Sequence, residues 1–319
     1  MTSSSQRTRV RRLAAMPLAV IAAALVLGCL PTEGVAGVTD RFAPCEDVAH
    51  FPELGDSTCT TASVPLWHEA AADGASIDLF VRRFPAAEPA NRRGEIWLVA
   101  GGPGEPGASL HPVLPTFRAA FPHHDLVLPD HRGTGGSERL CPEQESVESA
   151  AGVALAGEEW GPCIGGLHSD PDRVAAFSIT QAAHDLSTLL ERHRSDGEVL
   201  LYGVSYGTQL ALRMLQVAPA ALDGLILDGL VPPENAPQWD LSRRTAVVDE
   251  VGRAFLGEAA QAHAGILSGA GKLTFSTVQD GAHFLAYAAP ACFIEVASAF
   301  VADAHVPEDC TEPHASSER

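Results

Sequence analysis

Four apolar segments of strand length, separated by helical or glycine-rich stretches, constrain the fold of this chain more than any other feature. They are residues 95–100, 125–129, 198–202 and 225–227. Nearly continuous apolar runs of this length are typical of strands buried on both faces of a parallel sheet. Between them, Ile179–Arg194 and Tyr206–Val217 carry apolar residues at helical spacing. This alternation predicts an α/β fold, a mostly parallel sheet flanked by helices with right-handed crossovers.

The remaining segments extend this prediction. Ser63–Trp67 and Ser76–Arg82 predict an antiparallel hairpin at a sheet edge, because the turn-forming Ala72-Asp73-Gly74 separates them. Further helices are expected over Ala108–Phe121, Arg244–Gly257 and Pro290–Ala302, with a last short strand at Leu273–Val278. Residues 133–175 are rich in loop-forming residues and are expected to be mostly loop.

Composition and charge exclude several classes of protein. The 319 residues include 40 acidic and 21 basic side chains, which gives a formal net charge of −19. Such a surface repels a phosphate backbone, so no nucleic-acid partner is expected. With 46% apolar residues and no internal repeat, the chain can bury a full core and is not a solenoid.

The N-terminus has the pattern of an export signal. Four arginines, at positions 7, 9, 11 and 12, precede the charge-free apolar run Leu13–Gly28, which is too short to span a bilayer comfortably. The run ends in Val26-Leu27-Gly28-Cys29, which resembles a bacterial lipobox with Cys29 as the lipidated residue. Ordinary signal cleavage near Val35-Ala36-Gly37 is the alternative. We therefore expect a signal peptide at 1–28 and a single domain at 29–319. The protein should reside in the cell envelope, the periplasm or the medium, with membrane contact only through a lipid on Cys29.

Six further cysteines support export, because they form three couples that are close in sequence. We predict the disulfides Cys45–Cys59, Cys141–Cys163 and Cys292–Cys310, as expected in an oxidising compartment. The sequence contains no C-x-x-C, and its 13 histidines show no H-E-x-x-H spacing. No metal site and no cofactor are therefore expected.

The strongest candidate for chemistry is Gly203-Val204-Ser205-Tyr206-Gly207, which follows a predicted buried strand and opens a predicted helix. A sharp strand-to-helix turn lifts a serine hydroxyl off the sheet edge, and small residues two before and two after it avoid clashes. The helix N-terminus also favours developing negative charge. This pattern predicts Ser205 as a nucleophile.

A glycine-rich loop, Gly101–Gly107, follows the first buried strand. Its backbone N–H groups, with Gly102 foremost, could form an oxyanion hole together with the N–H of Tyr206. The same loop spells G-x-G-x-x-G, with Asp130 at the end of the next strand, so a dinucleotide site is an alternative. Pro103 and Pro106 oppose it, because they lack the N–H groups that would face a pyrophosphate.

A general base is expected after the serine in chain order. Gly281-Ala282-His283-Phe284 lies just after the last predicted strand, which makes His283 the candidate. Three earlier histidines, His123, His124 and His131, are expected to be structural or exposed.

These motifs, together with Asp130-His131-Arg132-Gly133-Thr134-Gly135-Gly136-Ser137 and Leu227-Asp228-Gly229, resemble the α/β-hydrolase fold. The resemblance is to the proline iminopeptidase and tripeptidyl aminopeptidase branch of serine peptidases, and the cysteine couples look like those of its exported members. It implies Ser205 as nucleophile, His283 as general base and an oxyanion hole from Gly102 and Tyr206. The loop 130–137 would brace the site. The substrate would be a small peptide.

The chain departs from that family at its cap and its triad acid. Residues 233–270 would form only a shortened cap, natural or truncated, and no glycine-aspartate turn that could supply the acid follows it. Asp228, at the end of the fourth buried strand, is the candidate acid, and capping of the next turn is its alternative role. A reduced cap would admit small esters as readily as peptides. A decayed homologue, kept as a binding or structural surface protein, is a further alternative.

Overall fold

A computed structural model of the chain describes residues 41–49, 54–70, 74–146, 148–150, 152, 154–231, 277–278, 284–307 and 309–310. These residues all belong to one compact unit, 38–319. Several expectations fall outside the described residues: the signal peptide with Cys29, the shortened cap 233–270, the helix at Arg244–Gly257 and His283.

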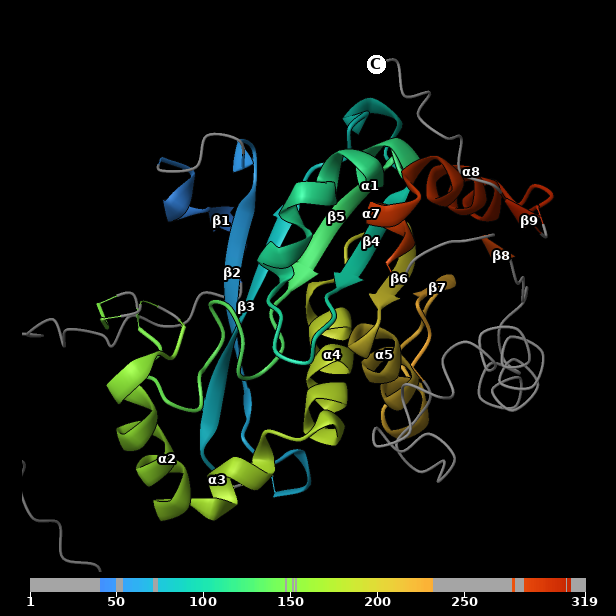
Figure 1. Cartoon of the computed structure of the whole chain (residues 1–319). Coiled ribbons are helices and arrows are strands. Elements are labelled where there is room, and N and C mark those ends of the chain that lie inside the picture. Colours follow the sequence, from blue (N-terminus) through green and yellow to red (C-terminus); the bar gives the residue numbers. More distant parts are fainter. Residues whose placement is uncertain are drawn as a thin grey trace, which may run out of the picture. The chain divides into compact units, whose positions relative to one another are not determined.

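The described residues form a mixed sheet whose strands follow the order β1-β2-β3-β5-β4-β6-β7 (Figure 1). Its strands are β1 Ala43–Pro44, β2 Thr58–Pro65, β3 Ser76–Phe84, β4 Gly94–Val99, β5 His124–Pro129, β6 Glu198–Val204 and β7 Gly224–Asp228. The pairs β1–β2, β2–β3 and β3–β5 are antiparallel. The strands β5, β4, β6 and β7 run parallel to one another. The predicted hairpin and parallel sheet are thus confirmed. A separate parallel pair joins β8 (Thr277–Val278) to β9 (Asp309–Cys310).

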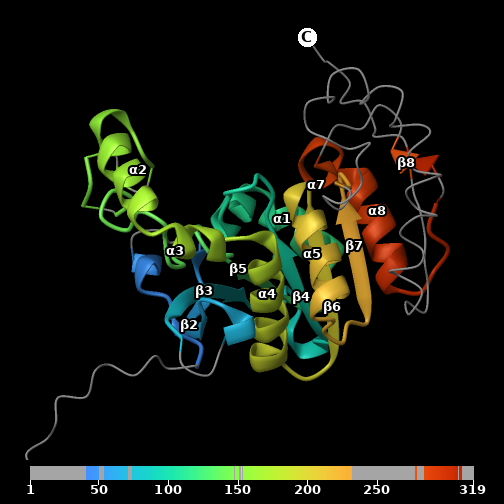
Figure 2. The same ribbon diagram turned by 90° about the horizontal axis from the view of Figure 1, so that it is seen from below.

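Helices cover both faces of the sheet (Figure 2). They are α1 Leu114–Ala120, α4 Ile179–His193, α5 Tyr206–Val217, α7 Leu285–Ala288 and α8 Pro290–Val301. Buried side chains of α4 and α5 pack on one face, beside Trp97, Val99 and Leu201. Side chains of α1, α7 and α8 pack on the other, beside Leu98 and Tyr202. Strands with apolar residues on both faces therefore lie between two helical layers, as their uninterrupted apolar runs predict.

Helix α4 shows how closely local sequence fixes these elements. Ser178 precedes it in an extended conformation, and its hydroxyl accepts a hydrogen bond from the N–H of Gln181 at 3.4 Å. Ala182, Leu186 and Leu190 repeat at helical spacing and are buried in the core. The helix therefore spans nearly the range that its apolar spacing predicts.

Two helical predictions differ from the structure. The expected helix Ala108–Phe121 consists of a 3₁₀ helix, Gly107–Val113, followed by the short α1. Pro112 and Pro115 lack the N–H that a continuous α-helix needs there. The stretch 133–175, expected to be mostly loop, contains α2 Trp160–Ser169 and α3 Pro171–Ala176. Three glycines and a proline in α2 lower its helix propensity and conceal it from the sequence pattern.

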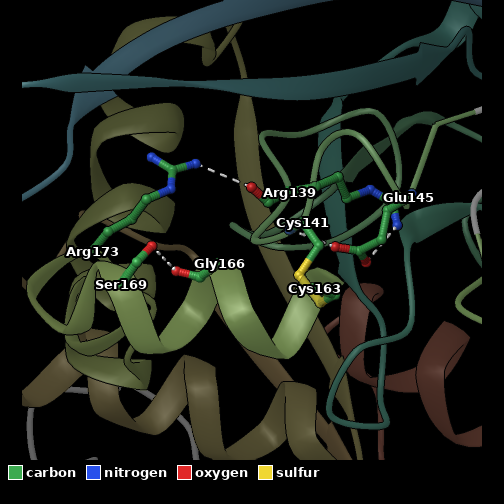
Figure 3. The surroundings of a disulfide bond; sticks show 7 residues. All are labelled: Arg139, Cys141, Glu145, Cys163, Gly166, Ser169 and Arg173. Atoms are coloured by element: carbon green, nitrogen blue, oxygen red, sulfur yellow. Dashed lines mark hydrogen bonds and ion pairs between the residues drawn. A yellow bond between two sulfur atoms is a disulfide. The ribbon is translucent and has the colours of Figure 1, made fainter. Parts of the chain in front are cut away.

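The structure contains the three disulfides that the cysteine couples predict. Their Cα–Cα distances are 5.0 Å for Cys45–Cys59, 5.3 Å for Cys141–Cys163 and 5.8 Å for Cys292–Cys310, within the normal range. Cys141–Cys163 attaches α2 to the loop after β5 (Figure 3). Glu145 stabilises that loop, because its carboxylate accepts a hydrogen bond from the N–H of Cys141 at 2.9 Å and lies 3.5 Å from the guanidinium of Arg139.

Candidate functional site

The order of the parallel strands fixes where a site can form. From β4 the chain passes to β5 on one side, and it returns to β6 on the other side of β4. Loops that leave neighbouring parallel strands in opposite directions open a crevice at their carboxyl ends. The loop Gly101–Gly107 leaves β4 at this edge, and Ser205 leaves β6 there, so the two sequence candidates converge.

Ser205 occupies a strained turn between β6 and α5. Its φ of 55° and ψ of −118° lie in a region that L-residues rarely adopt. Its N–H donates a hydrogen bond of 2.9 Å to the carbonyl oxygen of Asp228 at the end of β7. The residue remains half-buried at the start of the twelve-residue helix α5. This conformation holds the hydroxyl at the edge of the sheet, as the predicted turn requires.

The glycines around Ser205 are required by close backbone contacts. A Cβ on Gly203 would lie 2.5 Å from the carbonyl oxygen of Gly207, and one on Gly207 would lie 2.4 Å from that of Val99. A Cβ on Gly101 would lie 3.2 Å from the Cβ of Ser205. The glycine loop after β4 therefore contacts the serine directly, with no side chain between them.

Asp130 anchors this glycine loop. Its buried carboxylate accepts hydrogen bonds from the N–H of Gly107 at 2.6 Å and from the N–H of Gly136 at 2.7 Å. Burial raises the pKa of Asp130 above its usual range. Because this carboxylate is buried beneath the two loops that it joins, Asp130 is not accessible to a ribose. The dinucleotide alternative therefore does not fit the structure.

Arg132 holds the loop 130–137, to which it belongs, against helix α4. Its buried guanidinium donates two hydrogen bonds of 2.7 Å to the carboxylate of Asp185 on α4, and further bonds to the carbonyl oxygens of Leu66 and Ala176. A bidentate pair of this kind fixes orientation as well as distance. The loop thus ties the edge of the sheet to α4 and, through Asp130, to the glycine loop.

Tyr206 and His131 lie side by side next to Ser205. Their ring centroids are 5.5 Å apart, at an interplanar angle of 42°. Burial lowers the pKa of His131 to about 4, so its imidazole is neutral at physiological pH. The contact places His131 against Tyr206, the residue that follows the candidate nucleophile in the chain.

Asp228 is buried at the end of β7 and makes several hydrogen bonds. Its Oδ2 accepts from the hydroxyl of Tyr202 at 2.8 Å and from the N–H of Ala286 at 3.3 Å, and its Oδ1 accepts from the N–H of Leu285 at 2.9 Å. Burial, followed by the charge of Asp228, raises the pKa of Tyr202 well above its usual range, so the phenol keeps its proton as the donor. The carboxylate thus joins the nucleophile strand to α7, whose first residue lies two positions after His283.

Sequence reasoning missed Tyr202 and Phe284. Tyr202 carries a polar hydroxyl within the apolar part of β6, residues 199–204, and that exception is a signal that a buried partner exists. Phe284, next to His283, adopts φ 82° and ψ 75°, a left-handed conformation unusual for an aromatic residue. No sequence signal indicates it.

The described ranges hold neither a metal cluster nor a membrane-spanning helix. Among those residues, no group of three or more His, Cys, Asp or Glu side chains could hold a metal ion. Nor does any helix that the structure describes combine the length and apolar character that a membrane crossing requires.

Comparisons with known proteins agree with this architecture. A family model described as the alpha/beta hydrolase fold matches residues 96–282. YuaR of Escherichia coli (strain K12), a protein with hydrolase in its name, is 25% identical over 195 residues, which are 56% of this chain and 37% of YuaR. The chain therefore spans little more than a third of that relative.

Two solved structures show partial similarity to the chain. A carboxyl esterase from Bacillus coagulans is 16% identical over 60% of this chain and 51% of its own, with a TM-score of 0.33. An epoxide hydrolase from Aspergillus niger is 15% identical over 65% of this chain and 43% of its own, with a TM-score of 0.35. The family match covers more than half of the sequence, from a residue within β4 to a residue beyond β8. The chain therefore belongs to the α/β-hydrolase fold family.

Proposed function

We propose that this protein is a serine hydrolase that acts by acyl transfer through Ser205. The observation that carries the proposal is the strained turn of Ser205 at the carboxyl edge of the parallel sheet, in direct contact with the glycine loop. Unusual backbone conformations persist where the surrounding structure enforces them, and they cluster at functional sites.

In the proposed mechanism the Oγ of Ser205 attacks the substrate carbonyl while His283 takes the serine proton. The N–H of Tyr206 and the Gly102 loop stabilise the oxyanion of the tetrahedral intermediate, a contribution of about 3–4 kcal/mol for each donor. His283 then returns the proton to the leaving amine or alcohol, which departs as the acyl-enzyme forms. Water attacks the acyl-enzyme in the second half, with His283 again as base.

Asp228 is the proposed acid. Support comes from its bonds to the N–H groups of Leu285 and Ala286, the second and third residues after His283. A carboxylate can accept about four hydrogen bonds, so its bonds to α7 and Tyr202 are compatible with one to an imidazole N–H.

The proposed substrate class is a short peptide with a free N-terminus, by resemblance to the aminopeptidase branch, and small esters are the second class. The test is labelling of the mature, oxidised protein by a fluorophosphonate probe. We expect labelling that is lost in Ser205→Ala and retained in Ser169→Ala, a control serine on α2. Aminoacyl p-nitroanilides and p-nitrophenyl esters then separate the two substrate classes.

Failure of labelling in a protein shown to be folded by circular dichroism would refute the enzyme proposal. A hydrolase fold used as a surface binding protein would be the remaining interpretation. Labelling that persists in Ser205→Ala would instead assign the nucleophile to another residue.

We also propose export with a lipid on Cys29. The three disulfides support an oxidising compartment. In a bacterial host that processes lipoproteins, the wild-type protein should fractionate with membranes, and Cys29→Ser should move it to the soluble envelope fraction. Equal fractionation of the two would contradict the anchor.

A further inference from the structure

Glu105 lies in the glycine loop beside the candidate nucleophile. A Cβ placed on Gly101 would be 3.6 Å from Oε2 of Glu105 and 3.2 Å from the Cβ of Ser205. The carboxylate oxygen and the serine Cβ are therefore at most 6.8 Å apart, since the two distances add to that value. The side chain is exposed, and it forms no ion pair or hydrogen bond with any residue in the described part of the chain.

A carboxylate at this place, without an ion pair among the described residues, affects which acyl groups can react. The attack on a carbonyl develops negative charge in the oxyanion hole, and a second negative charge nearby opposes it. A substrate that brings a cation to Glu105 removes this repulsion. A substrate that brings another carboxylate increases it.

Distance indicates which cation fits. In an aminoacyl group the α-nitrogen is only two bonds, about 2.5 Å, from the carbonyl carbon. An ammonium so close to the reacting carbon can reach a carboxylate oxygen within 6.8 Å of the serine Cβ at a hydrogen-bond distance. The N-terminus of a tripeptidyl group would lie about 7 Å farther away, because each extended residue spans about 3.3–3.6 Å.

We propose that Glu105 is a specificity-determining residue that binds the α-ammonium of a single aminoacyl residue on the acyl side of the bond to be cleaved. The inference rests on the proposed function, since it takes Ser205 as the nucleophile. It assigns removal of one N-terminal residue, rather than of a tripeptide, to this site.

The test compares wild type with Glu105→Gln, which removes the charge and keeps the shape. The substrates are the p-nitroanilides of alanine, N-acetylalanine and N-succinylalanine, whose acyl groups carry a cation beside the carbonyl, no charge, and an anion at the far end of the succinyl chain. We expect wild type to prefer the cationic substrate over the neutral one in kcat/KM. In Glu105→Gln this ratio should fall about twofold to fivefold, mainly through KM, as expected for an ion pair with an exposed carboxylate, and the succinyl substrate should gain relative to the acetyl one.

Glu158→Gln, in an exposed 3₁₀ helix before α2, is the matched control for loss of one surface charge. It should leave the substrate ratios at their wild-type values. The preference should also decline above pH 8 in the wild type, because the α-amino group loses its charge there.

Two results would overturn the assignment, and they are distinguishable. If wild type is labelled by fluorophosphonate and hydrolyses the neutral substrate, but Glu105→Gln leaves the ratio of cationic to neutral substrate unchanged, the role of Glu105 is wrong and the hydrolase stands. If wild type is neither labelled nor active on any of the three, the proposed function fails and the role of Glu105 fails with it.

Discussion

Replacement of Asp228 separates a structural role from a catalytic one. Its carboxylate accepts hydrogen bonds from the hydroxyl of Tyr202 and from the N–H groups of Leu285 and Ala286, in a buried position. Asp228→Ala leaves these three donors without the acceptor, at about 1–3 kcal/mol for each buried unsatisfied group. After partial relaxation we expect a loss of about 3–5 kcal/mol in the free energy of unfolding, a large part of the stability of a typical domain.

Asp228→Asn keeps the volume and most of these bonds. With its amide oxygen in the place of Oδ2, it can still accept from Tyr202 and Ala286, and the NH₂ in the place of Oδ1 loses the 2.9 Å bond from Leu285. We expect a destabilisation of about 1 kcal/mol. If Asp228 is the triad acid, the turnover of this folded variant nevertheless falls by about 10⁴, because a neutral amide cannot stabilise the imidazolium of His283.

The assays are urea unfolding followed by circular dichroism, and hydrolysis of a p-nitrophenyl ester under saturating conditions. Tyr202→Phe is the control, since it removes one bond to Asp228 and keeps the carboxylate charge. A turnover of Asp228→Asn within tenfold of wild type would refute the acid role. Wild-type stability in Asp228→Ala would refute the account of the buried hydrogen bonds.

Two further predictions concern the edge of the sheet. Asp130→Asn places an NH₂ group against the N–H of Gly107 or Gly136, so we expect a loss of about 1–3 kcal/mol in stability and a slower fluorophosphonate reaction, as the glycine loop loses its anchor. An unchanged labelling rate in this variant would show that the loop is held by other contacts. His131 has a pKa of about 4 in the folded protein, compared with an ordinary value of 6.5, so the folded state binds fewer protons between these values. The stability present above pH 6.5 should therefore be lost as the pH falls through 6.5 toward 4, by up to about 3 kcal/mol from this group, and His131→Gln should flatten that slope in urea unfolding at stepped pH. Parallel slopes for the two proteins would contradict the shifted pKa.

The sequence predicts those parts of the structure whose causes are local. The spacing within Ile179–Arg194 and Tyr206–Val217 predicts α4 and α5 nearly to the residue, because each carries its own apolar stripe. The turn of Ser205 is predictable for the same reason, since the clashes that require Gly203 and Gly207 arise within one strand-turn-helix unit and its neighbour β4.

Contacts between distant segments could not be predicted in this way. The partners of Asp228 come from Tyr202, 26 residues earlier, and from Leu285, 57 residues later. Asp130 and Gly107 meet across 23 residues because β5 lies beside β4. Helix α2 is concealed for a different reason: it is attached by a disulfide, so its poor helix propensity does not decide its conformation. The side chain of Asp170 caps α3, and a proline follows it. This Asp-Pro pair is the sequence signal from which α3 could have been predicted.

The disulfides join the six cysteines from Cys45 to Cys310 in consecutive couples along the chain, across 14, 22 and 18 residues. In a protein translocated from its N-terminus, both members of one couple emerge before either member of the next. Under the proposed export, an oxidase that acts on thiols in order of arrival would make the native set out of the 15 pairings that six cysteines allow, with Cys45–Cys59 and Cys141–Cys163 closed before β7 emerges. If secreted as proposed, such a chain would need an electron acceptor during secretion, but no isomerase to correct its cross-links afterwards.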